Sequence, residues 1–311
     1  MTSPLVDVRH VTKCFQRGKQ TVTAVNDVSF AIHSGKTLGL VGESGCGKST
    51  LGRCLLNLEP LTSGEIWYDG KRSAHFSAEE LFHFRKRAQI IFQDPYSSLN
   101  PRMSALEIIA EPLYIHAQGN RAEILERVCH LAALVGLNPS SLKRFPHEFS
   151  GGQRQRIGIA RALALNPQFL VCDEPISSLD VSVQAQIVNL LKDLQAQFNL
   201  TYFFIAHNLA IVKYLSDRVA VMYLGHLVEL ADADALHRSP LHPYTQALLA
   251  AIPHIPPLQT LPAPEPLLLA APKQGCPFAS RCPHAHKRCF EERPVLREVG
   301  REHFVACHLI E

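Results

Sequence analysis

The segment from Gly42 to Ser49 reads Gly-Glu-Ser-Gly-Cys-Gly-Lys-Ser and satisfies the pattern G-x-x-x-x-G-K-S/T. Its glycines allow backbone angles that a Cβ atom disfavours, so successive N–H groups can point inward and form an anion site. Lys48 adds a positive charge. Ser49 offers a hydroxyl to a Mg²⁺ that bridges the β- and γ-phosphates, and Thr50 can donate a hydrogen bond to the α-phosphate. The pattern predicts a site for a nucleotide rather than for phosphate alone. The candidate contacts are Gly42, Glu43, Ser44, Gly45, Cys46, Gly47, Lys48, Ser49 and Thr50.

Two carboxylates, Asp173 and Glu174, follow the apolar run Phe169–Cys172. A buried strand would deliver Asp173 to the Mg²⁺ shell and place Glu174 beside the γ-phosphate, where a base orients water for in-line attack. Such a pair is more often a solvated strand end. The phosphate loop in the same chain favours the catalytic interpretation.

The elements around these residues fit a parallel sheet. Thr37–Val41 is a short apolar run that predicts a strand before the loop, and Ser49–Leu58 has helical composition. Strands are predicted at Phe169–Cys172 and Tyr202–Ala206, with a helix over Val183–Phe198 between them. This β-α-β order is typical of α/β proteins.

The flanking regions differ in composition. The first 34 residues are β-rich, whereas the middle of the chain has helical spacing of apolar residues. The predicted strands are Leu5–Val8, Thr21–Val25 and Val28–Ile32, and the predicted helices are Ala105–Ile115 and Arg121–Val135. The fold class is therefore α/β with a β-rich start and a helical insertion.

Composition limits the function classes. The chain has 311 residues, of which 46% are hydrophobic and 19% charged, so a folded protein of about two domains is expected. A net charge of +3 is too small to argue for nucleic acid as a partner. No apolar run reaches the ~20 residues of a membrane span, and residues 1–10 lack the pattern of a secretory signal, which points to the cytoplasm.

The last part of the chain carries a separate cysteine pattern. Residues 252–273 contain seven prolines and predict an extended linker. Beyond it, Cys276, Cys282, Cys289 and Cys307 have the spacing C-x5-C-x6-C-x17-C, which matches neither the usual zinc pairs nor ferredoxins. A small segment with little apolar core needs a cross-link in order to fold. In a reducing compartment a bound metal is favoured over disulfides for this role, and free thiols are the alternative. The spacing does not name the metal.

Further motifs resemble those of ABC-type ATPases. Phe149–Gln153 reads Phe-Ser-Gly-Gly-Gln and resembles the family's signature motif, between the phosphate loop and the Asp173–Glu174 strand. Gln93 resembles the Q-loop glutamine, Ser178–Asp180 the D-loop, and His207 the switch histidine. Phe15 resembles the aromatic residue that stacks on adenine, where tyrosine is commoner.

The resemblance implies a P-loop ABC ATPase fold. The expected parts are a β-rich antiparallel subdomain, a RecA-like parallel sheet core, a helical subdomain at about residues 93–165 and a small metal-binding C-terminal tail. The corresponding boundaries are 1–252 for the ATPase domain, 253–274 for the proline-rich linker and 275–311 for the Cys-rich segment.

Roles for individual residues follow from the same resemblance. Two such domains pair head to tail, so the signature motif of one closes over the nucleotide on the other. The implied catalytic residues are Glu174, His207 and Gln93, and the implied Mg²⁺ ligands are Ser49, Gln93 and Asp173. The implied nucleotide contacts outside the phosphate loop are Phe15, Gln93, Asp173, Ser150, Gly151, Gly152, Gln153 and Asp180.

Longer strings are similar to the ATPases of dipeptide and oligopeptide importers. They are Phe92–Arg102, Asp180–Gln186, His242–Thr245 and Gly275–Pro283. Two strings, Leu51–Arg53 and Asn100–Arg102, favour the second, F-type, of the two ATPase subunits in such importers. Asn208 and Ser178 depart from the usual aspartate and alanine, and neither removes a catalytic group.

This resemblance implies a peripheral subunit on the cytoplasmic face of the inner membrane. Its partners would be two integral permeases and a homologous sister ATPase, with an extracytoplasmic peptide-binding protein acting indirectly. In similar tails the four cysteines hold a 4Fe-4S cluster, with Zn²⁺ as the alternative. Two other functions stay open: an importer of another small solute such as nickel, and a soluble ABC-type ATPase of iron–sulfur assembly, DNA repair or translation.

Overall fold

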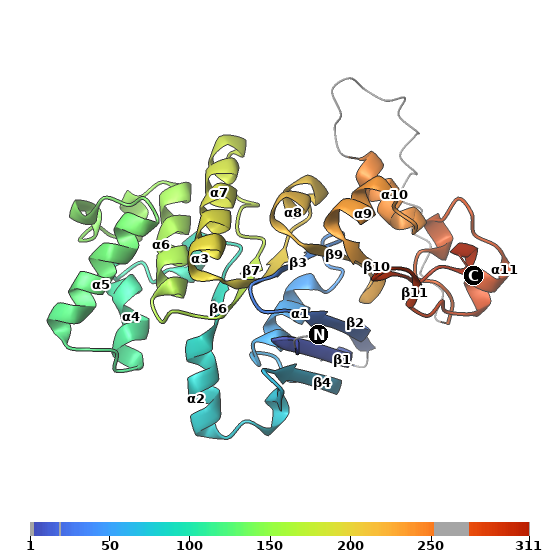
Figure 1. The fold of residues 1–311 in the computed structure, drawn as a ribbon, viewed down its shortest axis with the longest axis horizontal. Coiled ribbons are helices and arrows are strands. Elements are labelled where there is room, and N and C mark those ends of the chain that lie inside the picture. The colour runs from blue at the N-terminus through green and yellow to red at the C-terminus, as the bar shows by residue number, and fades with distance from the viewer. Residues whose placement is uncertain (1–2, 19, 252–273, 311) are drawn as a thin grey trace.

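A computed structural model describes residues 3–18, 20–251 and 274–310, and Figure 1 shows their arrangement. The β-rich start forms an antiparallel sheet with the strand order β2-β1-β4-β5. Its strands are β1 Val6–Arg17, β2 Gln20–Ile32, β4 Ser63–Tyr68 and β5 Lys71–Arg72. The two strands predicted at 21–25 and 28–32 are one continuous strand, β2. Asn26 and Asp27 form a bulge in it, with Asp27 at φ 52°, and β2 pairs with β1 on both sides of this bulge.

The main sheet has the order β11-β12-β10-β9-β3-β8-β7-β6. The five strands from β9 to β6 are parallel, and β10, β12 and β11 extend the sheet antiparallel. Every residue of β3, β7 and β8 is buried, as expected for a sheet covered on both faces. The strands are β3 Thr37–Val41, β6 Ala88–Ile91, β7 Phe169–Asp173, β8 Thr201–Ile205, β9 Arg218–Tyr223, β10 His226–Asp232, β11 Arg297–Gly300 and β12 His303–Val305.

Two apolar cores lie on the two faces of this sheet. Along β8, Phe203 and Ile205 join the core shared with α1 and the antiparallel sheet, whereas Tyr202 and Phe204 join the core shared with α7 and α8. The alternation follows from the period of two along a strand. The helices packed in this body are α1 Lys48–Leu55, α2 Ala78–Arg87, α7 Val181–Phe198, α8 Leu209–Leu215, α9 Ala233–Arg238 and α10 Pro243–Ala250.

A helical group stands between β6 and β7, at one end of the molecule (Figure 1). It consists of α3 Pro95–Ser98, α4 Ala105–Ile115, α5 Arg121–Leu134 and α6 Gly151–Leu163. Side chains of Ser104, Asn120 and Ser150 cap α4, α5 and α6 by accepting backbone N–H bonds, which fixes where each helix begins.

The Cys-rich segment packs at the opposite end of the sheet (Figure 1). It holds a short 3₁₀ turn at Ala279–Arg281, α11 Lys287–Glu291 and the strands β11 and β12. β12 pairs with β10 through the registers Glu229 with Val305 and Leu230 with Phe304. The predicted linker 253–274 lies outside the described residues except for Gln274.

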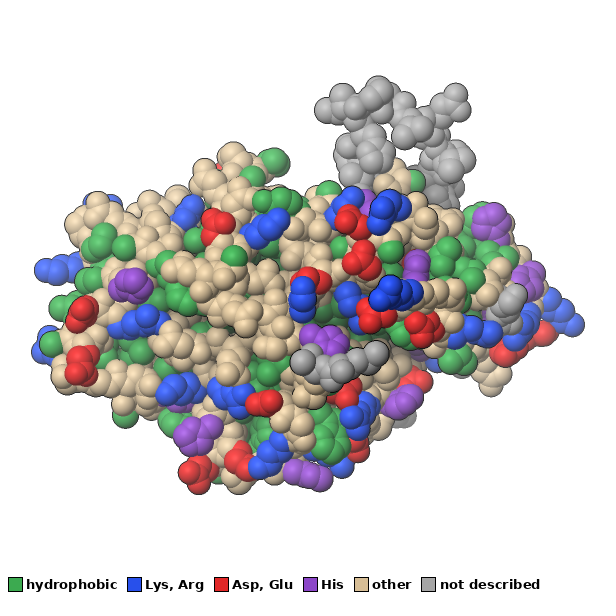
Figure 2. Space-filling view, in the orientation of Figure 1, with side chains coloured by type: hydrophobic (Ala, Val, Ile, Leu, Met, Phe, Trp, Pro, Cys, Tyr) green, Lys and Arg blue, Asp and Glu red, His purple; other side chains and the backbone are tan. Residues whose placement is uncertain are grey.

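The surface in Figure 2 carries acidic and basic side chains side by side. Among the described residues, none of the helices combines the length and apolar character that crossing a membrane requires.

Candidate nucleotide-binding site

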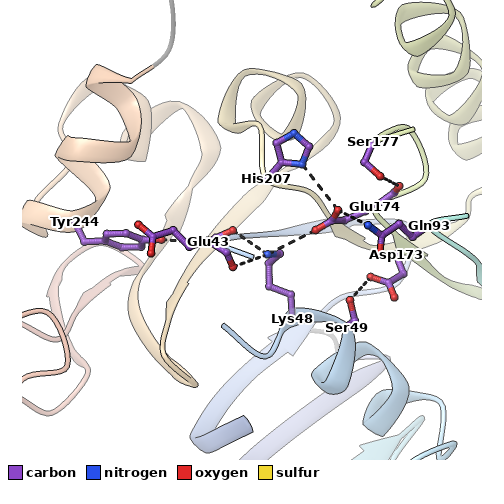
Figure 3. A network of polar contacts seen from close by, with 10 residues as sticks. Glu43, Lys48, Ser49, Gln93, Asp173, Glu174, Ser177, His207 and Tyr244 are labelled. Atoms are coloured by element: carbon purple, nitrogen blue, oxygen red, sulfur yellow. Dashed lines mark hydrogen bonds and ion pairs between the residues drawn. The ribbon is translucent and has the colours of Figure 1, made fainter. Parts of the chain in front are cut away.

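The phosphate loop connects β3 to α1. Gly47 caps α1 at φ 106°, and a Cβ atom there would lie 1.9 Å from the carbonyl oxygen of Ala24. Only glycine fits this position. Lys48 is buried, and its Nζ donates to the carbonyl oxygens of Gly42 at 2.8 Å and Glu43 at 3.0 Å (Figure 3). The loop therefore folds around the Lys48 ammonium group, which keeps a positive charge inside it.

Ser49 and Asp173 meet across the site. The Ser49 hydroxyl donates to Oδ1 of Asp173 at 2.7 Å, so the start of α1 and the end of β7 are in direct contact. Burial raises the pKa of Asp173, while the bond from Ser49 opposes that shift. One hydroxyl and one carboxylate fit Mg²⁺, since this ion usually takes few protein oxygens and completes its shell with phosphate oxygens and water.

Glu174 is the residue on which the other predicted groups converge (Figure 3). Its Oε2 accepts a hydrogen bond from Gln93 Nε2 at 3.0 Å and lies 3.9 Å from His207 Nδ1. Its Oε1 lies 3.7 Å from Lys48 Nζ. Three residues predicted to be catalytic thus meet beside Lys48 of the phosphate loop.

The sheet explains this convergence. Gln93 follows β6, Glu174 follows β7 and His207 follows β8, and these three strands are parallel neighbours. The carboxyl ends of parallel strands share one edge, which is where ligands bind in α/β sheets. Glu174 has a φ of 44°, which is rare for a residue with a side chain, and its N–H donates to the carbonyl of Ile205 at 3.0 Å.

The signature residues lie elsewhere in the molecule. Ser150 caps α6, and Gln153 closes the capping box by accepting from the Ser150 N–H at 3.0 Å. Ser150, Gly151 and Gln153 are exposed. In Figure 1 α6 stands in the helical group, apart from α1. A Cβ atom at Gly152 would lie 2.5 Å from Val183 of α7, so this glycine permits the close approach of the two helices.

Comparisons with known proteins agree with this geometry. Residues 25–177 match the "ABC transporter" family, and residues 228–289 match the "Oligopeptide/dipeptide transporter, C-terminal region". The oligopeptide transport ATP-binding protein OppF of Bacillus subtilis (strain 168) is 50% identical over 309 residues, covering 99% of this chain and 97% of its own length. This chain belongs to the ABC transporter family. Its fold is that of a P-loop ABC ATPase, and it hydrolyses ATP.

Other relatives and structures support the same assignment of this ABC ATPase. AppF of Bacillus subtilis (strain 168), also named an oligopeptide transport ATP-binding protein, is 50% identical over 95% of this chain and 92% of its own length. The dimeric cassette MJ0796 bound to ADP and phosphate superposes with a TM-score of 0.68 at 28% identity, covering 73% of this chain and 98% of that one. The cbiO1 structure from Clostridium perfringens gives 0.68 at 25% identity, covering 76% of this chain and 92% of that one.

Two residues predicted to contact the nucleotide, Phe15 and Asp180, lie on β1 and at the start of α7. Phe15 is half-buried on β1 with Lys13 Nζ 4.7 Å from its ring centre, and it pairs opposite Val22. Asp180 caps α7 and is exposed, without a side-chain bond to the helix. Their roles toward the nucleotide remain predictions.

Two residues beside the phosphate loop escaped the sequence analysis. The Tyr244 hydroxyl accepts from the Glu43 N–H at 3.0 Å, and Arg281 donates to both carboxylate oxygens of Glu43 at 2.9 and 3.0 Å. They lie 201 and 238 residues from Glu43 in sequence. No local pattern connects residues so far apart.

Three of the four tail cysteines, Cys276, Cys282 and Cys307, have thiols whose pKa is raised, first of all by burial. The pKa of Cys276 is raised to about 11, first by burial and then by the thiols of Cys307, Cys289 and Cys282, while a backbone hydrogen bond opposes the shift. Four neighbouring thiols are donors that suit a soft metal. Within residues 274–310 and the rest of the described chain, no group of three or more His, Cys, Asp or Glu side chains is arranged to hold a metal ion. The predicted metal-binding tail is therefore not seen as a formed site.

Proposed function

We propose that this chain is the ATP-hydrolysing subunit of an ABC importer for dipeptides or oligopeptides, bound to the cytoplasmic face of the membrane. The observation that carries the proposal is the meeting of Gln93, Glu174 and His207 beside Lys48 in a chain that matches oligopeptide transport ATP-binding proteins over almost its whole length. The match to the C-terminal region, residues 228–289, favours peptide over nickel as the cargo class and disfavours a soluble non-transport ATPase.

Hydrolysis adds water to the γ-phosphorus of ATP and releases ADP and phosphate. The attacking water must lose a proton, and in this proposal Glu174 accepts it. Gln93 fixes the orientation of that carboxylate, and His207 approaches it from β8. Ser49, Asp173 and Gln93 would hold Mg²⁺, which neutralises phosphate charge when bound.

The complete site needs a second ATPase subunit. Ser150, Gly151, Gly152 and Gln153 stand on a helix apart from the phosphate loop, and MJ0796, a relative in fold, is a dimer with ADP and phosphate bound. The proposed assembly pairs this chain, as the F-type subunit, with a homologous sister ATPase on two integral permeases. A peptide-binding protein outside the membrane would deliver the cargo.

Purification of the tagged chain from native membranes tests the assembly. Mass spectrometry should find two multi-spanning permeases and a second ATPase, and a peptide should stimulate ATP hydrolysis when its binding protein and the reconstituted complex are both present. Recovery of a soluble chain without permeases would overturn the importer proposal.

We also propose that Cys276, Cys282, Cys289 and Cys307 bind a 4Fe-4S cluster, with Zn²⁺ as the alternative. Two observations support the proposal: residues 228–289 match the C-terminal region of oligopeptide and dipeptide transporters, and the backbone N–H of Cys276 donates to the carbonyl of Cys289 at 2.7 Å in the folded tail. Cys276→Ser should abolish bound iron in anaerobically purified protein and increase proteolysis of residues 275–311. Cys129→Ser, a change at α5 outside the tail, is the matched control. Equal metal content in the two variants would contradict the proposal, and zinc in place of iron would select the alternative.

A further inference from the structure

The tail reaches the phosphate loop through one side chain. Arg281, in the 3₁₀ turn Ala279–Arg281, places one guanidinium nitrogen 2.9 and 3.0 Å from the two carboxylate oxygens of Glu43. The same nitrogen lies 3.4 Å from the Tyr223 hydroxyl. Burial would lower the pKa of Arg281, but its bonds to Tyr223 and Glu43 outweigh burial and raise it. The arginine therefore stays a cation at this position.

An aromatic cluster fixes where Arg281 stands. Phe278, three residues earlier, is 3% exposed, and its ring centre lies 5.3 Å from those of both Tyr223 and Tyr244. The Arg281 guanidinium is 5.7 Å from the Phe278 ring and 5.8 Å from the Tyr223 ring. Since Tyr223 ends β9 and Tyr244 lies in α10, the body of the protein holds the arginine in place.

Glu43 is consequently held at each of its polar groups. Its N–H donates to Tyr244, its carbonyl accepts from Lys48, and its carboxylate accepts from Arg281. Figure 3 shows the first two of these contacts on one side of the loop. A loop fixed in advance loses less conformational entropy when it binds a ligand. Pairing with Arg281 also offsets a negative charge that would otherwise repel the phosphates.

We propose that Arg281 is a positioning residue of the nucleotide site, which acts through Glu43 to hold the first turn of the phosphate loop. The Cys-rich tail then forms part of the nucleotide site, and loss of its fold would weaken ATP binding in the same chain. This inference rests on the proposed binding of ATP at the phosphate loop.

Equilibrium binding of MgATP to the full chain tests the role of Arg281. Because the Arg281 and Glu43 side chains are 28% and 43% exposed, solvent screens the pair, and Arg281→Gln should raise the Kd for ATP about three- to tenfold. Arg281→Lys keeps the charge and should recover part of the affinity. Arg288→Gln is the control, since Arg288 pairs with Glu292 inside the tail. An unchanged Kd for Arg281→Gln in a variant that melts with the wild type would overturn the proposal.

A double-mutant cycle separates positioning through Glu43 from the general attraction of a positive charge. In a Glu43→Gln background, Arg281→Gln should have little additional effect on the Kd. Additive effects would show that Arg281 does not act through Glu43 and would also overturn the proposal. Lys48→Ala tests separately whether ATP binds at the phosphate loop at all. Undiminished ATP binding in that variant would show that the nucleotide binds elsewhere.

Discussion

At the scale of single residues, Glu174 lies at the centre of the candidate site and has an unfavourable backbone conformation. Its carboxylate contacts Gln93 and lies near Lys48 and His207, while its φ of 44° is rare outside glycine. A conformation of this kind costs about 1–3 kcal/mol and persists where the surrounding structure enforces it. Here the N–H bond to Ile205 and the end of β7 impose it, so the side chain is directed at the site.

We expect Glu174→Gln to bind MgATP with nearly the wild-type Kd and to hydrolyse it at least ~100-fold more slowly, because the amide keeps the shape but cannot accept the proton of water. Binding by fluorescence and turnover by phosphate release measure the two effects. Glu291→Gln, at an exposed position on α11, is the control. Turnover of Glu174→Gln close to that of the control would exclude Glu174 as the base.

Sequence motifs predicted the residues that converge on Glu174, because each lies within a few residues of a strand end. They did not predict Tyr244 or Arg281 as neighbours of Glu43. Tyr244 belongs to a string that resembles peptide importers, yet its hydroxyl reaches the loop only because α10 packs beside β9, and that packing has no local signal.

At the scale of elements, one buried carboxylate joins three segments. Glu229 on β10 is fully buried, and its oxygens accept from the N–H groups of Leu241 at 2.8 Å and His242 at 3.0 Å, at the start of α10. His303 of β12 places Nε2 2.8 Å from the same carboxylate. The Glu229 side chain therefore connects the main sheet, the start of α10 and the tail.

Glu229→Ala should lower the free energy of unfolding by about 3 kcal/mol, because it leaves buried donors without an acceptor. Protease should also cut the tail faster in this variant. Denaturant unfolding and limited proteolysis measure these effects against Glu79→Ala, an exposed glutamate on α2. Equal stability of the two variants would show that Glu229 is not the link between the segments.

Local patterns predicted the elements well where apolar spacing decides them. β3 and α4 have the predicted bounds, Thr37–Val41 and Ala105–Ile115. β11 and β12 were not predicted. Both are short, and β12 pairs with β10, more than 70 residues earlier in the chain, while β11, among the described strands, pairs only with β12. The distant pairing of β12 with β10, rather than local preference, places this hairpin in the sheet.

At the scale of the whole molecule, the signature residues and the phosphate loop stand on different parts of one chain. Ser150 begins α6 in the helical group, whereas the loop follows the carboxyl end of β3, an inner strand of the main sheet (Figure 1). A helix N-terminus attracts phosphate through its free N–H groups. This arrangement is why we expect one subunit to bind ATP and two to hydrolyse it.

Ser150→Asp tests this division of labour. Aspartate keeps a good N-cap for α6, but its charge would face the phosphates on the paired subunit. We expect unchanged ATP binding by the isolated chain and at least a tenfold loss of hydrolysis in the purified transporter, from Coulomb repulsion across the pair. Asn120→Asp makes the same kind of change at the cap of α5 and is the control. Full activity of the assembled Ser150→Asp variant would contradict the paired site.

The pairing of β12 with β10 also bears on how the chain matures. A ribosome completes β10 long before it reaches residues 303–305. Until then β10 pairs with β9 on one side only, and the backbone groups on its other side have no strand beside them. Chains interrupted within the proline-rich stretch would keep this edge open and could pair with one another. We therefore expect β12, once it is synthesised, to close the edge of β10 to pairing with other chains.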